Sequence, residues 1–262
     1  MPASSVSIEL MMITSLKAMR CSNRLDTLVS NSPADIKDFY DLHRGKLIFK
    51  PLSYANWLFD GGSAGIYTSR IERPHLDDSA ALQACAGIFQ PEIQKSYELR
   101  VTVMGRSIFA AEIATQTEKI SLDWRVDFND NPPCRPYKLP SEIEQKIHLF
   151  MKTSGLVFGC FDFIVDKSGQ YIFLELNEMS QFLWLDFAIT RFRQFDAFCN
   201  FLLKASPGFE YEEGYDPLTV QQFHNYYIEN KETYDRLEKD HVPAENTMSI
   251  IESDRITSRM IK

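Results

Sequence analysis

The stretch from Gly159 to Asp186 constrains the fold of this 262-residue chain more than any other. Two runs rich in aromatic and β-branched residues, 159–165 and 170–177, flank the turn sequence Asp166-Lys167-Ser168-Gly169. This pattern predicts a β-hairpin. Polar side chains are few in this stretch.

Three polar side chains of this hairpin are expected to lie together. Side chains alternate along a strand, so Glu175 and Asn177 share one face, about 7 Å apart. A two-residue loop sets Asp162 opposite Glu175 and a four-residue loop sets it one pair away, and both leave it on that face. Two carboxylates this close repel unless a proton or cation lies between them, and oxygen ligands favour Mg²⁺ over zinc. The pattern predicts a magnesium site; the alternative is a hairpin with polar residues facing water.

The same residues carry a resemblance to a known family. Asp162, then Leu174-Glu175-Leu176-Asn177 and Gln181-Phe-Leu-Trp-Leu-Asp186, look like the metal-binding end of the ATP-grasp ligases. More narrowly, the stretch resembles the graspetide, or microviridin-type, ligases, which form lactones and lactams in ribosomal peptides. The resemblance implies an α+β fold in which two lobes, built of antiparallel sheets and packed helices, enclose the nucleotide. It also implies that Asp162, Glu175 and Asn177 hold magnesium ions that bridge the phosphates of ATP.

Candidate nucleotide-binding residues precede the hairpin. Lys50, at the end of a run that predicts a buried strand, is similar to a lysine that contacts the phosphates in this family. Gln90, Glu92 and Ile93 correspond to the hinge that holds adenine between the lobes, mainly through backbone groups. The turn at Asp60–Gly65 corresponds to a mobile flap over the phosphates.

Two arginines are catalytic candidates by resemblance. Arg100 lies in Glu-Leu-Arg-Val-Thr-Val-Met-Gly, a run close to one in which the arginine faces the γ-phosphate and the acyl phosphate, and we therefore also count it as nucleotide-binding. Arg125 lies in Asp-Trp-Arg and is expected to bind phosphate or the substrate carboxylate. From alternation alone, Glu98, Arg100 and Glu112 could instead face solvent.

The resemblance implies an ATP-dependent ligase that uses ATP and Mg²⁺ and joins a carboxylate to an amine or alcohol through an acyl phosphate. The expected substrate is a precursor peptide with Asp or Glu as electrophile and Ser, Thr or Lys as nucleophile. Two alternatives stay open. One is an ATP-grasp ligase for a small amino or carboxylic acid, and the other is a catalytically silent ATP-binding scaffold.

The predicted organisation has four segments. They are an N-terminal helix or remnant of a front domain (1–25), a small lobe (26–93), a large lobe with the hairpin (94–205) and a C-terminal extension (206–262). The family usually has a further α/β domain ahead of the segment that resembles Leu28. Three explanations stay open: a truncated start, a homodimer or partner protein that supplies this domain, or a degenerate enzyme.

Composition excludes several classes of protein. A net charge of −8 argues against a general nucleic-acid binder, which needs a basic face to displace counterions. Five scattered cysteines without a CxxC pair favour reduced thiols and argue against structural zinc. No apolar run reaches the roughly 20 residues that span a bilayer, and the N-terminus lacks a secretion signal. These features predict a cytoplasmic protein without a membrane partner.

Local signals predict further elements. Ser32 and Pro33 predict the start of a helix that ends near His43. Further helices are expected at 6–20, from 140 or 141 to 153, at 184–203 and at 220–238, and strands at 97–104 and 107–113. In the helix expected from 140 or 141, helical spacing predicts a buried stripe formed by Ile143, Ile147, Phe150 and Met151. No role is assigned to His148.

Overall fold

The computed structural model describes residues 25–52, 56–59, 62–65, 67–114, 122–123, 133–178, 181–204 and 206–240. The predicted helix at 6–20 lies outside this part of the chain. Contacts divide the chain into two compact units, one up to Pro217 and one from Leu218. The boundaries of the two predicted lobes stay a prediction.

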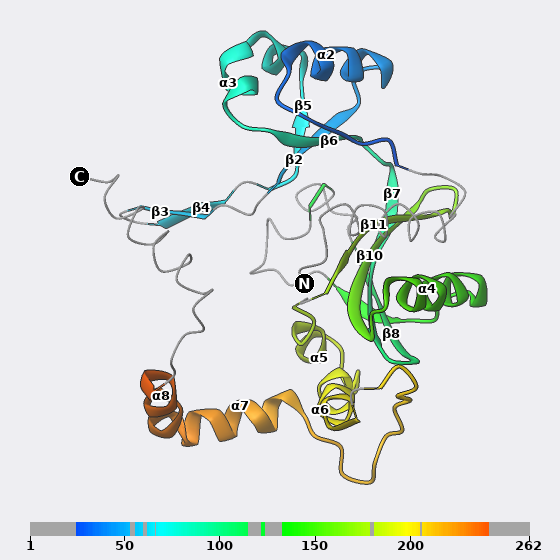
Figure 1. The fold of residues 1–262 in the computed structure, drawn as a ribbon, viewed down its shortest axis with the longest axis vertical. Coiled ribbons are helices and arrows are strands. Elements are labelled where there is room, and N and C mark those ends of the chain that lie inside the picture. Colours follow the sequence, from blue (N-terminus) through cyan, green and yellow to red (C-terminus); the bar gives the residue numbers. More distant parts are fainter. Residues whose placement is uncertain are drawn as a thin grey trace, which may run out of the picture. The chain divides into compact units, whose positions relative to one another are not determined.

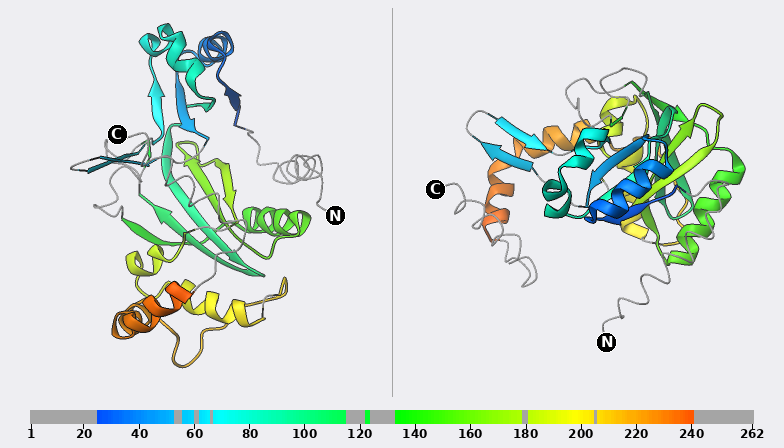
Figure 2. Two further views of the ribbon diagram at one scale, coloured as in Figure 1. Left: turned by 60° about the vertical axis from the view of Figure 1, so that its left-hand side comes forward. Right: turned by 90° about the horizontal axis from the view of Figure 1, so that it is seen from above.

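A four-stranded antiparallel sheet, in the order β1-β6-β2-β5, begins the first unit. Its strands are β1 (Leu28–Ser30), β2 (Leu47–Pro51), β5 (Ser69–Ile71) and β6 (Gly87–Pro91). The helical elements of this region are α2 (Pro33–Leu42), the 3₁₀ turn η1 (Arg73–Asp77) and α3 (Ser79–Ala84). Helix α2 lies against the sheet, and its Ile36 is buried with Leu47 and Phe89 (Figure 2).

The start of α2 confirms the predicted cap. The Ser32 side chain accepts the backbone N–H of Asp35, and Pro33 occupies the first turn, where a missing N–H costs nothing. The helix ends at Leu42, one residue before the predicted end.

The expected turn at Asp60–Gly65 is wrong for its second half. Gly62–Gly65 forms strand β4, which pairs with β3 (Asn56–Phe59) in a separate two-stranded sheet. Glycine weakens a strand without preventing it, because ladder hydrogen bonds join backbone groups. Asp60 and Gly61 lie outside the described residues.

A five-stranded antiparallel sheet, in the order β11-β10-β7-β8-β9, forms the larger part of the first unit (Figure 1). Its strands are β7 (Lys95–Met104), β8 (Ser107–Ile113), β9 (Cys134–Tyr137), β10 (Phe158–Asp166) and β11 (Tyr171–Asn177). The predicted strands at 97–104 and 107–113 and the predicted hairpin are confirmed.

Helix α4 (Ser141–Ser154) covers one face of this sheet (Figure 1). The predicted stripe is confirmed, since Ile143, Ile147, Phe150 and Met151 are all buried. They pack against side chains such as Phe161 of β10. We call this side of the sheet the α4 face and the other side the polar face.

Two short helices pack against part of the polar face, where one long helix was expected. They are α5 (Trp184–Ala188) and α6 (Gln194–Lys204), so the predicted helix at 184–203 is wrong. Arg191 and Arg193 between them have φ of 62° and 67°, a left-handed conformation that breaks a helix. The Asp186 carboxylate accepts the N–H groups of Gln194 and Phe195, at 3.1 and 2.7 Å, and thereby starts α6.

The segment after α6 belongs to the core of the first unit. Phe209 is buried, its carbonyl accepts the N–H of Arg106 at 2.7 Å, and Tyr211 N–H donates to Ser107 Oγ at 2.7 Å. Gly105 has φ +61°, and a Cβ there would lie 2.6 Å from the Phe209 carbonyl oxygen. The close approach therefore requires glycine at this turn.

The second unit contains α7 (Val220–Glu229) and α8 (Lys231–Asp240). A single helix at 220–238 was expected, but the helix is interrupted at Asn230. Thr219 and Gln222 form a reciprocal capping box at the start of α7. Among the described helices, none has the length and apolar character needed to cross a membrane.

The α4 face offers a test of the core. Ile147 is completely buried, whereas Leu149 on the same helix is 50% exposed. We expect Ile147→Ala to lower the free energy of unfolding by about 2 to 5 kcal/mol, because it leaves a cavity. The matched Leu149→Ala variant should stay within about 0.5 kcal/mol of wild type. Urea unfolding measures both, and equal losses would contradict the assigned packing.

Candidate active site

The turn of the β10–β11 hairpin has neither of the two expected lengths. Asp166 N–H donates to the Gln170 carbonyl at 3.0 Å, and Gly169 adopts φ +82°, which closes a three-residue loop. This loop pairs Phe163 with Phe173. Regular alternation from that pair would place Leu174 opposite Asp162 and turn Glu175 to the α4 face.

A β-bulge restores the predicted face. The register shifts between Phe163 and Asp162, so Leu174 becomes an extra residue and Asp162 pairs with Glu175. Beyond the bulge, Leu176 packs on the α4 face, and Glu175 and Asn177 share the polar face with Asp162. The expected shared face is confirmed, but the bulge produces it.

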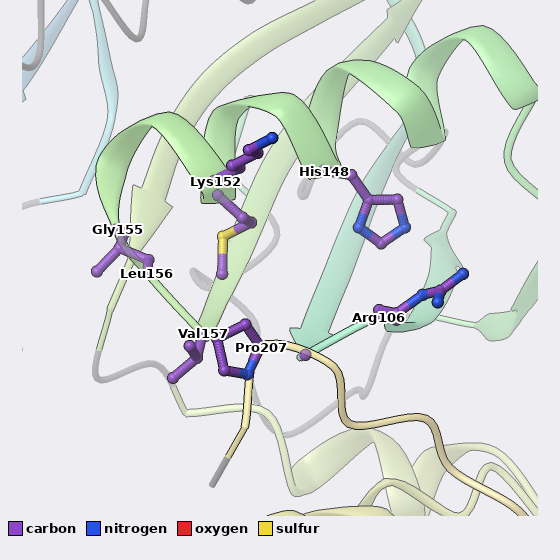
Figure 3. Close-up of a pocket in the computed structure, with 9 residues that line it drawn as sticks. Arg106, His148, Lys152, Gly155, Leu156, Val157 and Pro207 are labelled. Atoms are coloured by element: carbon purple, nitrogen blue, oxygen red, sulfur yellow. The ribbon is translucent and has the colours of Figure 1, made fainter.

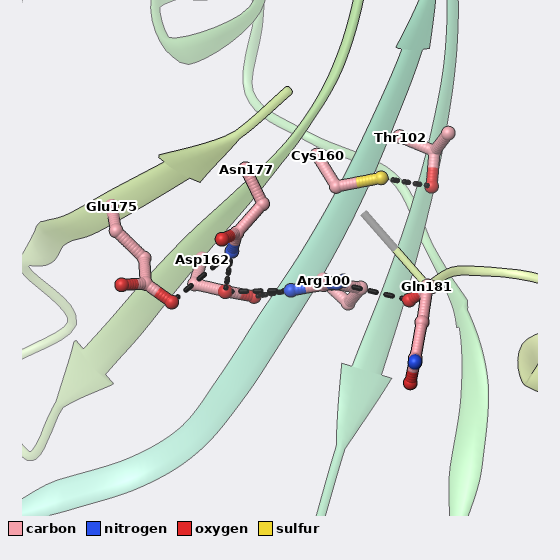
Figure 4. Close-up of polar contacts among 7 residues, drawn as sticks. All are labelled: Arg100, Thr102, Cys160, Asp162, Glu175, Asn177 and Gln181. Atoms are coloured by element: carbon pink, nitrogen blue, oxygen red, sulfur yellow. Dashed lines mark hydrogen bonds and ion pairs between the residues drawn. The ribbon is translucent and has the colours of Figure 1, made fainter. Parts of the chain in front are cut away.

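The Asn177 amide lies within hydrogen-bonding reach of both Asp162 and Glu175 (Figure 4). The Asn177 amide donates to Asp162 Oδ2 and to Glu175 Oε1, each at 3.1 Å. Within the described ranges, no three side chains of His, Cys, Asp or Glu gather as a metal cluster. The donor set is thus two carboxylates and one amide, whose oxygens suit a hard cation such as Mg²⁺.

Arg100 lies directly across from Asp162 on β7. Its Nη1 donates to both carboxylate oxygens of Asp162, at 2.7 and 2.6 Å, and its Nη2 donates to the Gln181 carbonyl at 3.0 Å (Figure 4). The two side chains are 11% and 22% exposed. A guanidinium held here can stabilise negative charge that develops on a bound phosphoryl group.

Burial dominates the acidity of Asp162. It raises the pKa of this carboxyl to about 6, while Arg100 lowers the pKa and Glu175 and Glu98 raise it. Burial disfavours the charged form, and a nearby positive charge favours it. A cation bound beside Asp162 would therefore compete with a proton near neutral pH.

Sequence reasoning missed a second ion pair on the polar face. A register shift at Ser96 turns Lys95 towards Glu98, and the two form an ion pair while Lys95 Nζ donates to the Leu122 carbonyl at 3.0 Å. Both side chains are largely buried, at 8% and 13% exposure. The possibility that Glu98 faces solvent is therefore wrong. No sequence signal marks the bulge that brings the pair together.

Glu112 and Arg100 likewise do not extend freely into solvent. Glu112 is buried, and both of its carboxylate oxygens accept from Arg135, at 2.7 and 2.8 Å. Leu99 is its partner across the ladder, which assigns Glu112 to the α4 face. It therefore does not join the group around Asp162.

Lys50 and Gln90 lie on the face of the small sheet opposite α2. Lys50 pairs with Ile88, and Ile48 pairs with Gln90, so alternation puts all four on one side. Gln90 is buried and its Nε2 donates to Thr27 Oγ1 at 2.9 Å, while its Oε1 has no hydrogen-bond partner among the described residues. That orphaned acceptor can take a donor from a ligand.

Of the two other predicted hinge residues, Glu92 already forms hydrogen bonds within the protein. The Glu92 carboxylate accepts from Arg70 at 2.9 and 2.7 Å, and the Glu92 N–H donates to the Lys46 carbonyl at 3.0 Å. Ile93 is half-buried and forms no hydrogen bond with another described residue. Backbone recognition of a base would therefore fall to Ile93 and its neighbours, not to the Glu92 N–H.

Arg125 lies outside the described residues. Two positions before it, Asp123 is buried and accepts from the N–H and Oγ1 of Thr68, at 3.3 and 2.9 Å. This links Asp123 to the segment just before β5.

Comparison with known proteins gives matches among solved structures. No family model and no curated protein matches the sequence. One of the matching solved structures is a RiPP-associated ATP-grasp ligase from Chryseobacterium gregarium, in complex with ADP and a leader and core peptide. Its sequence is 31% identical to this chain, and the TM-score is 0.63. The match covers 69% of this chain and 54% of that one. The macrocyclase MdnC from Microcystis aeruginosa, bound with precursor peptide MdnA, is 30% identical with a TM-score of 0.58, over 68% and 54%.

A third structure supports the fold alone. The ATP-grasp ligase PsnB, complexed with precursor peptide PsnA2 and AMPPNP, is 20% identical with a TM-score of 0.51, over 68% of this chain and 52% of that one. The chain thus spans about half the length of these structures.

The acidity of Asp162 can be measured directly. We expect its side-chain carboxyl to titrate with a pKa of about 6, and higher in Arg100→Gln because Arg100 favours the charged form. The pKa in the folded state is raised above the ordinary value of the carboxyl. The carboxyl therefore stabilises the fold at pH values below its ordinary pKa, and this contribution is lost as the pH rises through about 6. Carboxyl ¹³C shifts follow the titration. Arg135→Gln is the control, and an Asp162 titration at an ordinary carboxyl pKa would contradict the burial assigned here.

Proposed function

The described part of the chain has the fold of the ATP-grasp ligases and resembles those associated with RiPP maturation, and we propose that the protein is an ATP-dependent peptide ligase. It would join a side-chain carboxylate of a precursor peptide to a hydroxyl or amine of the same peptide. The products are lactone or lactam crosslinks. The observation that carries this proposal is the convergence of Asp162, Glu175, Asn177 and Arg100 on one sheet face.

The proposed cofactors are ATP and Mg²⁺. Asp162, Glu175 and Asn177 would hold the metal, which supplies positive charge to the phosphates when bound. The Asn177 amide donates to both carboxylates here, and rotation of the amide group would present its oxygen instead. Among the similar solved structures, one complex of PsnB contains Mg and ADP.

Lys50, Arg100 and Arg125 are proposed to neutralise phosphate charge. Arg100 is already held beside Asp162 by two donor groups, so little reorganisation is needed when a phosphoryl group arrives. Gln90, Glu92 and Ile93 would hold adenine. Gln90 Oε1 has no hydrogen-bond partner in the part of the chain that the structure describes, which supports this role for Gln90. The ion pair with Arg70 gives Glu92 a supporting role.

The proposed reaction needs no covalent intermediate on the protein. A substrate carboxylate oxygen attacks the γ-phosphorus of ATP, which yields an acyl phosphate and ADP. A peptide hydroxyl or amine then attacks the acyl carbon, the C–O bond to phosphate breaks, and phosphate leaves as the nucleophile loses its proton. Positioning and electrostatic stabilisation supply the catalysis.

ATP and Mg²⁺ are plentiful in the cytoplasm, and we propose the cytoplasm as the location of the protein.

Calorimetry tests the nucleotide site. We expect ATP to bind wild type in a Mg²⁺-dependent manner, and Glu175→Gln to weaken that binding by about tenfold or more, because a carboxylate ligand is lost. Glu210→Gln, an exposed position outside the site, is the matched control. Absence of binding to folded wild-type protein would contradict the proposed ligase.

Mass spectrometry tests the substrate class. Incubation with ATP, Mg²⁺ and a precursor peptide rich in Asp, Glu, Ser, Thr and Lys should remove one water for each bond formed, and Arg100→Gln should abolish the loss. ADP formation with a small amino or carboxylic acid, but never with a peptide, would assign the chain to a small-molecule ligase instead.

A further inference from the structure

A cavity of about 580 Å³ lies on the α4 side of the first unit, away from the group around Asp162. Three elements line it: the β7–β8 turn, the C-terminal half of α4 with the residues that follow it, and the segment after α6 (Figure 3). Its volume falls within the range of ligand pockets and far exceeds what a single phosphate group fills.

Three basic residues line this cavity, Arg106, His148 and Lys152, and no lining residue is acidic. His148 and Lys152 project from α4 four residues apart, and the His148 imidazole points towards the turn that carries Arg106 (Figure 3). Within the described ranges, none of the three forms a side-chain hydrogen bond or an ion pair. Basic residues gathered without acidic partners are notable in a chain whose net charge is −8.

The acidic residues of α4 do not neutralise this cluster. Glu142 is paired with Lys146 at 2.6 Å. Glu144, one turn before His148, does not line the cavity. The carbonyl end of α4 disfavours an anion, but the Met151 and Lys152 carbonyls already accept the N–H groups of Leu156 and Gly155, at 3.0 and 3.3 Å. The side-chain charges therefore set the sign of the local potential.

Apolar surface adjoins the basic groups. Met151, Leu156, Val157 and Pro207 complete the lining. A small hydrated anion gains nothing from such surface, whereas a peptide that alternates acidic and apolar side chains can contact both. We propose that this cavity is a docking site for an acidic, apolar peptide segment, separate from the nucleotide site. The carboxylates bind Arg106 and Lys152, and the apolar side chains contact Leu156 and Val157.

Fluorescence anisotropy tests the docking site on the full chain. The probe is a labelled peptide that alternates glutamate and leucine, with a glutamine and leucine peptide for comparison. We expect the double variant Arg106→Glu, Lys152→Glu to bind the acidic peptide about tenfold more weakly or worse, since two attractions become repulsions. Lys37→Glu, Lys138→Glu is the control, because it makes the same charge change at exposed positions outside the cavity.

Each outcome of this experiment either supports or overturns the proposed docking site. Equal binding of the acidic peptide to both double variants, or equal binding of the glutamine peptide to wild type, overturns the proposal. Calorimetric binding of inorganic phosphate without peptide binding also overturns it, since it assigns the cavity to a small anion. If the charge reversal impairs folding, Arg106→Gln, Lys152→Gln replaces it with the same expected direction. Mg²⁺-ATP binding by each variant should match wild type, which separates this test from that of the nucleotide site.

Discussion

The strict alternation of side chains along a strand is the constraint on which the candidate site depends. In β7 and β11 the polar side chains would not all reach one face if the strands were regular. The extra residues Ser96 and Leu174 shift the alternation, and they bring Lys95 beside Glu98 and Glu175 beside Asp162. A bulge costs ladder hydrogen bonds, so the packed α4 face has to compensate for it. The aromatic cluster around Phe161 supplies that packing.

Around Asp162, opposing electrostatic effects are closely balanced. Burial disfavours the charged form of the Asp162 carboxyl. The Arg100 guanidinium offsets this effect only in part, because the pKa stays raised at about 6. Asn177 contributes neutral donors to both acids. Such an arrangement accepts an added cation more readily than a fully neutralised pair would, since negative charge remains to be compensated.

Much of the fold follows from local sequence signals. The Ser32 cap, the α4 stripe and the hairpin depend on neighbours in the chain, and each is confirmed. The break between α5 and α6 was not predicted, because it depends on Asp186 accepting N–H groups eight and nine residues away. The loop length and its compensating bulge were also missed, since register is decided by tertiary packing. The face of Asp162 was predicted correctly because two shifts of register cancel. The three-residue loop moves the register by one residue, and the bulge moves it back.

The contact between Gly105 and Phe209 has a consequence for the chain beyond α6. The turn has no room for a Cβ because the Phe209 backbone lies against it, and Arg106 and Ser107 hydrogen-bond to that segment. A chain truncated just before Phe209 would therefore lack a hydrophobic side chain of the core and leave the β7–β8 turn uncovered. The sequence alone suggests that a C-terminal extension begins here, but this segment packs as part of the domain that contains the five-stranded sheet.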